Sequence, residues 1–348
     1  MQNFWTKLKK PFFVLAPMAD VTDAAFRRLI AKYGKPDVTW TEFVSADGLA
    51  RAPEEGKKKL LKDLEYSESE RPIVAQLFSS NSENMEKAAK LCADLGFDGI
   101  DINMGCPDKT VEKQGCGAAM IKNPERAREV IMAAKRGAPN LPISVKTRLG
   151  YNKDELETWL PFLLSCDLAA ITIHARTRKE MSKVPARWDR IKRAVEIRDE
   201  YFSKNPEGSL LGKTLIIGNG DALDLEDAKQ KAEESGADGV MLGRAIFGNP
   251  FLFFALNNSP HPDPLLHKER EVGIQMRLEV MLEHTKLFEE LLMPPKNFAI
   301  MKKHYKAYVK DFDGAGDLRT KLMNAENAAE VENIVKDFLD LTLGTGVI

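Results

Sequence analysis

Eight short apolar runs, each followed by a longer stretch with helical spacing of apolar residues, constrain the fold of this chain more than any other feature. Most of the runs are rich in β-branched residues and lack strict alternation. That pattern is typical of parallel strands buried on both faces. We expect these strands at residues 12–16, 38–43, 73–78, 99–103, 143–147, 169–174, 215–219 and 239–243.

Residues that favour helix starts precede several of the intervening stretches. Thr22 or Asp23 can cap one helix, Asn81 or Ser82 another, and Pro124 suits a first helical position. Further helices are expected at residues 154–165, 186–201 and 224–235. Eight strand–helix units predict an α/β fold, a (β/α)8 TIM barrel. A doubly wound open sheet is the alternative, but it usually has fewer strands and a GxGxxG motif after the first one, which this chain lacks.

The pattern changes after a stretch rich in turn residues at 257–263. Helical periodicity alone follows, at residues 269–292, 297–311 and 325–341. We therefore predict two domains, a barrel over residues 1–256 and a small C-terminal all-helical domain over residues 262–348.

Charge is nearly balanced over the 348 residues, with a formal net charge of −1, so the chain as a whole is not a basic nucleic-acid binder. Residues 296–321 are the exception, because they hold seven basic and three acidic side chains. His304, Tyr305 and Tyr308 are interleaved with them. A basic helix with aromatic residues suits a phosphate backbone, and a solvated helix face is the alternative.

Cysteine spacing and hydropathy indicate the compartment. The four cysteines form no CxxC pair and no zinc pattern, so we expect reduced thiols and no metal. The first ten residues are polar and basic, and no run approaches the length of a transmembrane helix. A soluble cytoplasmic protein without a membrane partner is expected.

Polar residues gather where the predicted strands end, which is the active face of such barrels. Each of these residues alone has an ordinary structural explanation, and Cys106, between Gly105 and Pro107, could equally be a small buried hydrophobe. Their occurrence on successive strands favours a site. They are Gln76, Asn103, Cys106, Lys146, Arg148, His174 and Asn219.

Three strand ends suit a flavin nucleotide. A buried lysine needs an anionic or polar partner, and Lys146 would suit the flavin N1/O2 edge, where negative charge develops on reduction. The Gly218-Asn-Gly220 and Gly243-Arg244 segments follow the last two strands, the usual phosphate site of this fold. Small residues there let backbone N–H groups reach phosphate oxygens.

The chain resembles the tRNA-dihydrouridine synthase family over about residues 12–322. The tail and Met104 are most similar to the bacterial B-type branch. The matching motifs are Ala16-Pro-Met-Ala-Asp-Val-Thr-Asp-Ala-Ala-Phe-Arg27, Asn103-Met-Gly-Cys-Pro107 with Gly115-Cys-Gly-Ala-Ala119, Val145-Lys-Thr-Arg-Leu-Gly150, His174-Ala-Arg-Thr177, Gly218-Asn-Gly-Asp221, Gly236-Ala-Asp-Gly-Val-Met-Leu-Gly-Arg-Ala245 with Gly248-Asn-Pro250, and Met301-Lys-Lys-His304 with Leu318-Arg319.

This resemblance implies an FMN enzyme, reduced by NADPH, that saturates the C5–C6 bond of a tRNA uridine as a monomer. The helical domain would help to hold tRNA. By motif position, Cys106 is the proton donor, and Asn103 and Arg148 face the uracil. The flavin is expected to contact Pro17, Met18, Ala19, Gln76 and Lys146, with its ribityl phosphate side held by His174, Asn219, Gly220, Asp221, Gly243 and Arg244.

The residue types suit that chemistry. A thiol with a pKa near 8.5 is mostly protonated at neutral pH and can act as an acid, and the target base must be flipped out of the tRNA. One alternative is a flavin barrel that reduces a free small molecule such as a pyrimidine, and another is a non-catalytic RNA-binding protein. Cys116 and the long segment 198–213 depart from the family pattern and have no assigned role.

Overall fold

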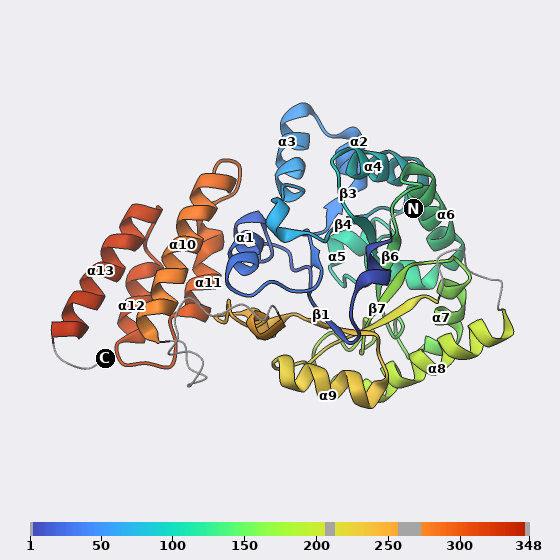
Figure 1. Cartoon of the computed structure of the whole chain (residues 1–348). Helices are drawn as coiled ribbons and strands as arrows, with labels where there is room; N and C mark the ends of the chain where they lie inside the picture. The colour runs from blue at the N-terminus through green and yellow to red at the C-terminus, as the bar shows by residue number, and fades with distance from the viewer. Residues whose placement is uncertain (1–2, 206–212, 257–272, 345–348) are drawn as a thin grey trace. The chain divides into compact units, whose positions relative to one another are not determined.

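The computed structural model describes residues 3–205, 213–256 and 273–344 (Figure 1). The expected linker at 257–263, the start of the predicted helical domain at 262–272 and part of the long segment 198–213 lie outside these residues.

All nine strands pair in parallel within one sheet. The order is β1-β9-β8-β7-β6-β5-β4-β2, and a bridge between Val14 and Val38 joins the two ends of this order. This arrangement confirms the predicted barrel. The strands are β1 (Phe12–Leu15), β2 (Thr39–Trp40), β3 (Val44–Ser45), β4 (Ile73–Phe78), β5 (Gly99–Asn103), β6 (Ile143–Arg148), β7 (Ala170–His174), β8 (Leu215–Asn219) and β9 (Gly239–Leu242).

The strand predicted at 38–43 is shorter in the structure, because only β2 lies within that range and β3 follows it; both pair with β4. Between them, the Thr41 hydroxyl accepts a hydrogen bond of 3.0 Å from the backbone N–H of Gln76. A side chain thus takes the place of a backbone acceptor, and the regular ladder is interrupted there.

The predicted barrel helices are present, and their caps explain where they begin. Asp23 accepts from the N–H of Phe26, and Asn81 from that of Asn84. The helices are α1 (Ala24–Tyr33), α4 (Ser82–Asp94), α6 (Pro124–Gly137), α7 (Leu156–Leu164), α8 (Trp188–Lys204) and α9 (Leu225–Ser235). Three further helices were not predicted: α2 (Ala46–Arg51), α3 (Glu54–Asp63) and α5 (Lys109–Lys113). The first and last are short, and α3 buries no residue.

The tail is helical, as predicted. It contains α10 (Ile274–Leu292), α11 (Met301–Tyr308), α13 (Ala328–Gly344) and the additional short helix α12 (Ala315–Leu322). These helices share an apolar core that includes Leu278, Phe288, Met301 and Val335.

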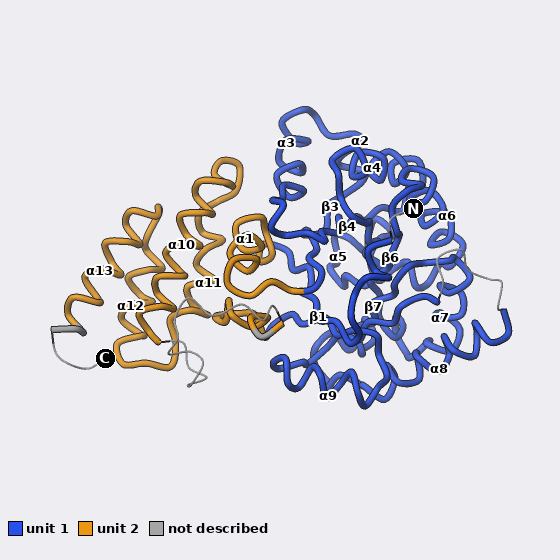
Figure 2. Tube along the Cα trace, in the orientation of Figure 1, with its two compact units in different colours: residues 1–19, 37–244 blue, residues 20–36, 245–348 orange. Residues whose placement is uncertain are grey.

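The chain separates into two compact units, coloured in Figure 2. The barrel unit contains residues 1–19 and 37–244, and the helical unit contains residues 20–36 and 245–348. Helix α1 belongs to the helical unit because it packs on α10, where the Glu283 carboxylate accepts hydrogen bonds from Lys32 Nζ and from the Tyr33 hydroxyl. This grouping differs from the linear boundary predicted at residues 256–262.

No helix within the described ranges is long and apolar enough to cross a membrane. In the same part of the chain, no three His, Cys, Asp or Glu side chains gather as metal ligands would.

Candidate active site

Strand register brings the predicted site residues to one level of the barrel. Asn103 on β5 lies opposite Lys146 on β6, and Arg148 lies opposite His174 on β7. His174 in turn lies opposite Asn219 on β8. Because all the strands are parallel, these side chains come together where the strands end.

Lys146 is held by a side chain of β8, two strands away in the sheet. Its Nζ donates to Asn219 Oδ1 at 3.1 Å, and Asn219 Nδ2 donates to the carbonyl of Met241 at 2.8 Å. Burial, followed by the nearby Arg148 guanidinium, lowers the pKa of Lys146 to about 8. With this pKa the amine is still mostly protonated at neutral pH, and an anion bound on this face would stabilise its charge.

Gln76 is fully buried in a carboxamide network with Asn103 and Asp101. Its side chain accepts from Asn103 Nδ2 at 2.9 Å and donates to Asp101 Oδ2 at 2.6 Å. The Ser144 hydroxyl donates to the other carboxylate oxygen of Asp101. Burial raises the pKa of Asp101 to about 6. Asp101 was not predicted, although it precedes Asn103 by two positions and so lies on the same face of β5.

The Cys106 thiol lies on a loop that Asn103 fixes. Asn103 Oδ1 accepts from the backbone N–H groups of Gly105 at 3.1 Å and Cys106 at 2.9 Å. The carbonyl of Cys106 accepts from Ala118 N at 2.9 Å. Burial raises the pKa of the partly exposed Cys106 thiol, so it is protonated at neutral pH.

Cys116 is a packing residue next to this loop. It is fully buried with Phe78 and Val111, and burial raises its pKa to about 11. The following residue, Gly117, has a φ of +59°, and a Cβ atom there would lie 2.6 Å from the Cys106 carbonyl oxygen. The glycine is therefore needed for the close approach of this segment to Cys106.

Arg148 uses its guanidinium to hold loops. Its Nε donates to the carbonyl of Gly105 at 2.7 Å, and its Nη1 donates to the carbonyls of Thr177 and Met181, each at 3.3 Å. Burial lowers its pKa to about 10.

Asp221 lies between two arginines. Its carboxylate accepts from Arg176 Nη2 at 2.5 Å and from Arg244 Nη2 at 2.7 Å. Arg176 also lies 3.2 Å from His174 Nε2. Burial and the surrounding cations, Lys146 first among them, hold the pKa of His174 well below its usual range. Arg176, which was not among the predicted site residues, is thus central to this corner.

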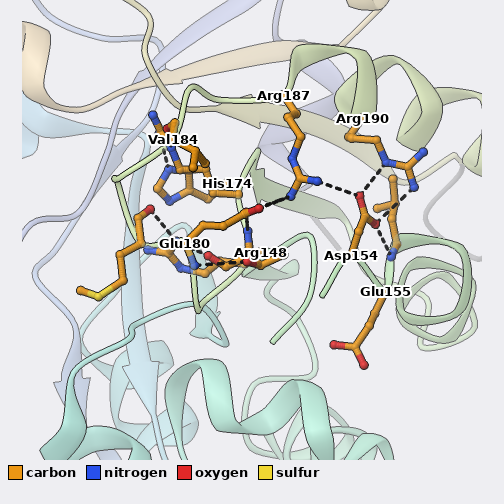
Figure 3. Close-up of polar contacts among 12 residues, drawn as sticks. Arg148, Asp154, Glu155, His174, Glu180, Val184, Arg187 and Arg190 are labelled. Atoms are coloured by element: carbon orange, nitrogen blue, oxygen red, sulfur yellow. Dashed lines mark hydrogen bonds and ion pairs between the residues drawn. The ribbon is translucent and has the colours of Figure 1, made fainter. Parts of the chain in front are cut away.

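The loop after β7 is tied to its neighbours by further ion pairs, which Figure 3 shows. Arg187 pairs with Glu180 at 2.9 Å and with Asp154 at 3.7 Å, and Arg190 pairs with the same Asp154 at 2.8 Å. Arg176 Nε donates to the carbonyl of Val184. The residues of this loop are therefore held in a defined position.

One glycine permits a close approach at the remaining strand ends. Gly220 has a φ of +129°, and a Cβ atom there would lie 2.9 Å from that of Ala186. Gly243 differs, because a Cβ atom there would make only ordinary contacts, 3.6 Å from that of Ala16 and 3.8 Å from the sulfur of Met18. Pro17 and Met18 are half-buried at this point, and Ala19 is exposed.

The strand ends thus concentrate cations that lower one another's pKa, next to a protonated thiol. An anionic ligand would relieve this repulsion, and the thiol could donate a proton to a neighbouring carbon.

A family model and several known proteins match this chain over nearly its whole length. A family model described as "Dihydrouridine synthase (Dus)" matches residues 14–342. "Probable tRNA-dihydrouridine synthase 2" of Bacillus subtilis (strain 168) is 41% identical over 97% of either chain. "Probable tRNA-dihydrouridine synthase" of Staphylococcus aureus (strain COL) is 39% identical over 97% of this chain and 96% of that one. Among solved structures, histamine dehydrogenase from Rhizobium sp. 4-9 aligns with a TM-score of 0.49 and 12% identity, over 79% of this chain and 48% of that one.

Proposed function

This chain belongs to the dihydrouridine synthase family, and from that premise we propose that it is a flavin-dependent enzyme that reduces a uridine of tRNA to 5,6-dihydrouridine. The observation that carries the proposal is the place of Cys106, on the loop after β5 that Asn103 and Arg148 hold by hydrogen bonds to its backbone. We further propose NADPH as the reductant, a monomer as the active form and the cytoplasm as its location.

The cationic strand ends fit FMN. Burial and the Arg148 guanidinium lower the pKa of Lys146, and burial and several cations lower that of His174. A bound phosphate and an electron-rich ring would stabilise the protonated forms of both. When bound and reduced, FMN would supply a hydride for C6 of the uracil. Lys146 and Gln76 would contact the flavin ring, with Pro17, Met18 and Ala19 beside it.

The phosphate side is proposed at His174, Arg176 and Arg244, with the close backbone approach of Asn219, Gly220 and Gly243. Asp221 would orient the two arginines rather than contact phosphate, since its carboxylate already accepts from both and would repel a phosphate dianion.

Cys106 would transfer its proton to C5 of the uracil as the C6–H bond forms. A raised thiol pKa keeps this proton in place until negative charge develops on the ring. Asn103 fixes the thiol loop through its Oδ1 and would meet the uracil with its amide. Arg148, whose Nε and Nη1 are committed to carbonyls, has its Nη2 left to face the base.

The helical unit would bind the tRNA backbone through the outer face of α11. Lys306 is exposed on this helix, and Lys310 is exposed two residues after the helix ends. Tyr305 and Tyr308, expected to lie among the basic residues, are instead buried in the core of this unit. RNA contact at this face would therefore rest on charge and not on base stacking.

The test compares two cysteine variants of the flavin-loaded enzyme. Cys106→Ala should lower dihydrouridine formation in tRNA by about 100-fold or more, the scale of general acid catalysis, while NADPH still reduces the flavin. Cys116→Ala, the matched control, should keep nearly full activity. Full activity in Cys106→Ala would refute the role of the thiol, and reduction of free uracil as fast as tRNA would favour the small-molecule alternative.

A further inference from the structure

The loop that carries Cys106 is joined to the loop after β7 by an ion pair. Arg178 Nε donates to Glu112 Oε1 at 2.7 Å, and Arg178 Nη2 donates to Glu112 Oε2. Two parallel bonds of this kind fix the relative orientation of both side chains. The Glu112 side chain is only 9% exposed and that of Arg178 24%, so the pair is shielded from solvent.

Arg178 is anchored independently of Glu112. Its backbone N–H donates to the carbonyl of Gly150 at 2.9 Å, and its guanidinium lies over the Tyr151 ring, 5.3 Å from the centroid. The next residue, Lys179, donates to the carbonyl of Tyr151. Arg178, on the loop after β7, is thus also attached to the loop after β6, and its guanidinium holds Glu112 of α5.

A second arginine holds the same loop from the other side of the thiol. Arg148 donates to the carbonyl of Gly105, the residue before Cys106, and also to two carbonyls of the loop after β7. Glu112 lies six residues after Cys106. The chain is therefore attached to the loop after β7 on both sides of the thiol, through Arg148 at Gly105 and through Arg178 at Glu112.

We propose that Arg178, through its ion pair with Glu112, is a positioning residue that sets the place of the Cys106 thiol for proton transfer. This inference rests on the proposed function of Cys106. A proton donor must be within hydrogen-bond reach of its target, and small displacements of catalytic groups cost large factors in rate. Neither Arg178 nor Glu112 contacts the thiol, so their effect would be exerted through the loop.

The experiment uses Glu112→Gln in the flavin-loaded enzyme, which keeps the side-chain shape and removes the charge. Two rates are compared: flavin reduction by NADPH, and single-turnover dihydrouridine formation from pre-reduced enzyme. We expect the second to fall at least tenfold and the first to stay unchanged. The rate of Cys106 alkylation by iodoacetamide should rise in the same variant, because the loop is released.

Two further variants separate positioning from general stability. Glu112→Arg alone and Arg178→Glu alone should each lower turnover. The double variant, which exchanges the two charges, should recover part of that loss. Glu86→Gln, which breaks an exposed pair with Arg136 on the barrel surface, should change neither rate.

Unchanged turnover and unchanged alkylation in Glu112→Gln would overturn the inference, as would an equal loss in both half-reactions. Absence of dihydrouridine with the unmodified enzyme would instead refute the proposed function. The alkylation rates would still show whether the ion pair holds the loop.

Discussion

Two clusters of buried titratable side chains differ in what surrounds them. At the barrel strand ends, Lys146 and Arg148 are hydrogen-bonded to side chains and carbonyls of neighbouring strands and loops. In the helical unit, the rings of His284 and His304 lie 4.6 Å apart and pack on Phe26. Within the described residues, the Nε2 atoms of both histidines have no hydrogen-bond partner.

Both clusters have lowered pKa values, so a perturbed pKa alone does not distinguish them. The barrel cluster combines several cations with convergent polar groups, and an anion would stabilise it. The histidine pair is neutral and enclosed by aromatic rings, so it stabilises packing only while it stays unprotonated. Hydrogen bonds among the buried polar groups, rather than burial itself, distinguish the candidate site from the histidine pair.

The largest expected effect on activity comes from a substitution at the barrel strand ends. Lys146→Met should lower dihydrouridine formation by about 100-fold, the usual loss when a donor to developing negative charge is removed. The melting temperature should stay the same or rise, because an apolar chain of similar length replaces a buried charge. Activity assays and thermal melts of the purified variant measure both.

The same activity assays and thermal melts, applied to the histidine pair of the helical unit, test the other side of the comparison. His304→Leu should leave dihydrouridine formation unchanged. If instead Lys146→Met lowered stability and kept its activity, the barrel cluster would be structural, and the difference between the two regions would disappear.

Acid should destabilise the helical unit. Burial lowers the pKa of His304 to about 3, and it also lowers that of His284. In the unfolded chain a histidine has a pKa near 6.5, so between these lowered pKa values and 6.5 the unfolded chain binds more protons than the folded one. Stability is therefore lost as the pH falls below 6.5. At pH 5 the loss from His304 is about 2 kcal/mol relative to pH 7.5, and His284 adds to it in the same direction.

Urea unfolding at pH 7.5 and pH 5 measures this loss. His304→Leu should show a smaller difference between the two pH values than the unmodified protein. Equal pH dependence in both proteins would mean that His304 titrates normally, and that the cluster is not closed to protons.

The smallest effect is expected on the outer face of the helical unit. Lys306 lines a surface hollow with Arg319 and Thr320. Lys306→Gln should weaken tRNA binding a few-fold and lower the slope of log K against log salt by about 1, the change for one lost phosphate contact. Binding measured over a salt series tests this, with Lys336→Gln on α13 as the control. An unchanged slope would place the RNA elsewhere.

The strands could be predicted from the sequence because parallel strands buried on both faces leave continuous apolar runs. The helices could be placed because Asp23, Asn81 and Pro124 begin them with recognisable chemistry. Strand β2 was harder, since one hydroxyl from Thr41 interrupts its ladder.

The site was predictable only where its residues follow strand ends. Arg178 and Glu112 are 66 residues apart, and no local pattern joins them. The partners of Arg148 are backbone carbonyls, which side-chain patterns do not record. The burial of Tyr305 and Tyr308 was readable, because positions 301, 304, 305 and 308 have the spacing of a helix core face.

The inclusion of helix α1 in the helical unit has a consequence for biosynthesis. Lys32 and its partner Glu283 are separated by 251 residues. At about 5–20 residues per second, α10 leaves the ribosome roughly 10–50 seconds after α1. Throughout that interval the apolar side of α1, with Ala25 and Leu29, lacks the helices that cover it in the finished protein. A helix made early is therefore among the last elements to be covered, and a chain shortened before α10 would leave α1 without a partner.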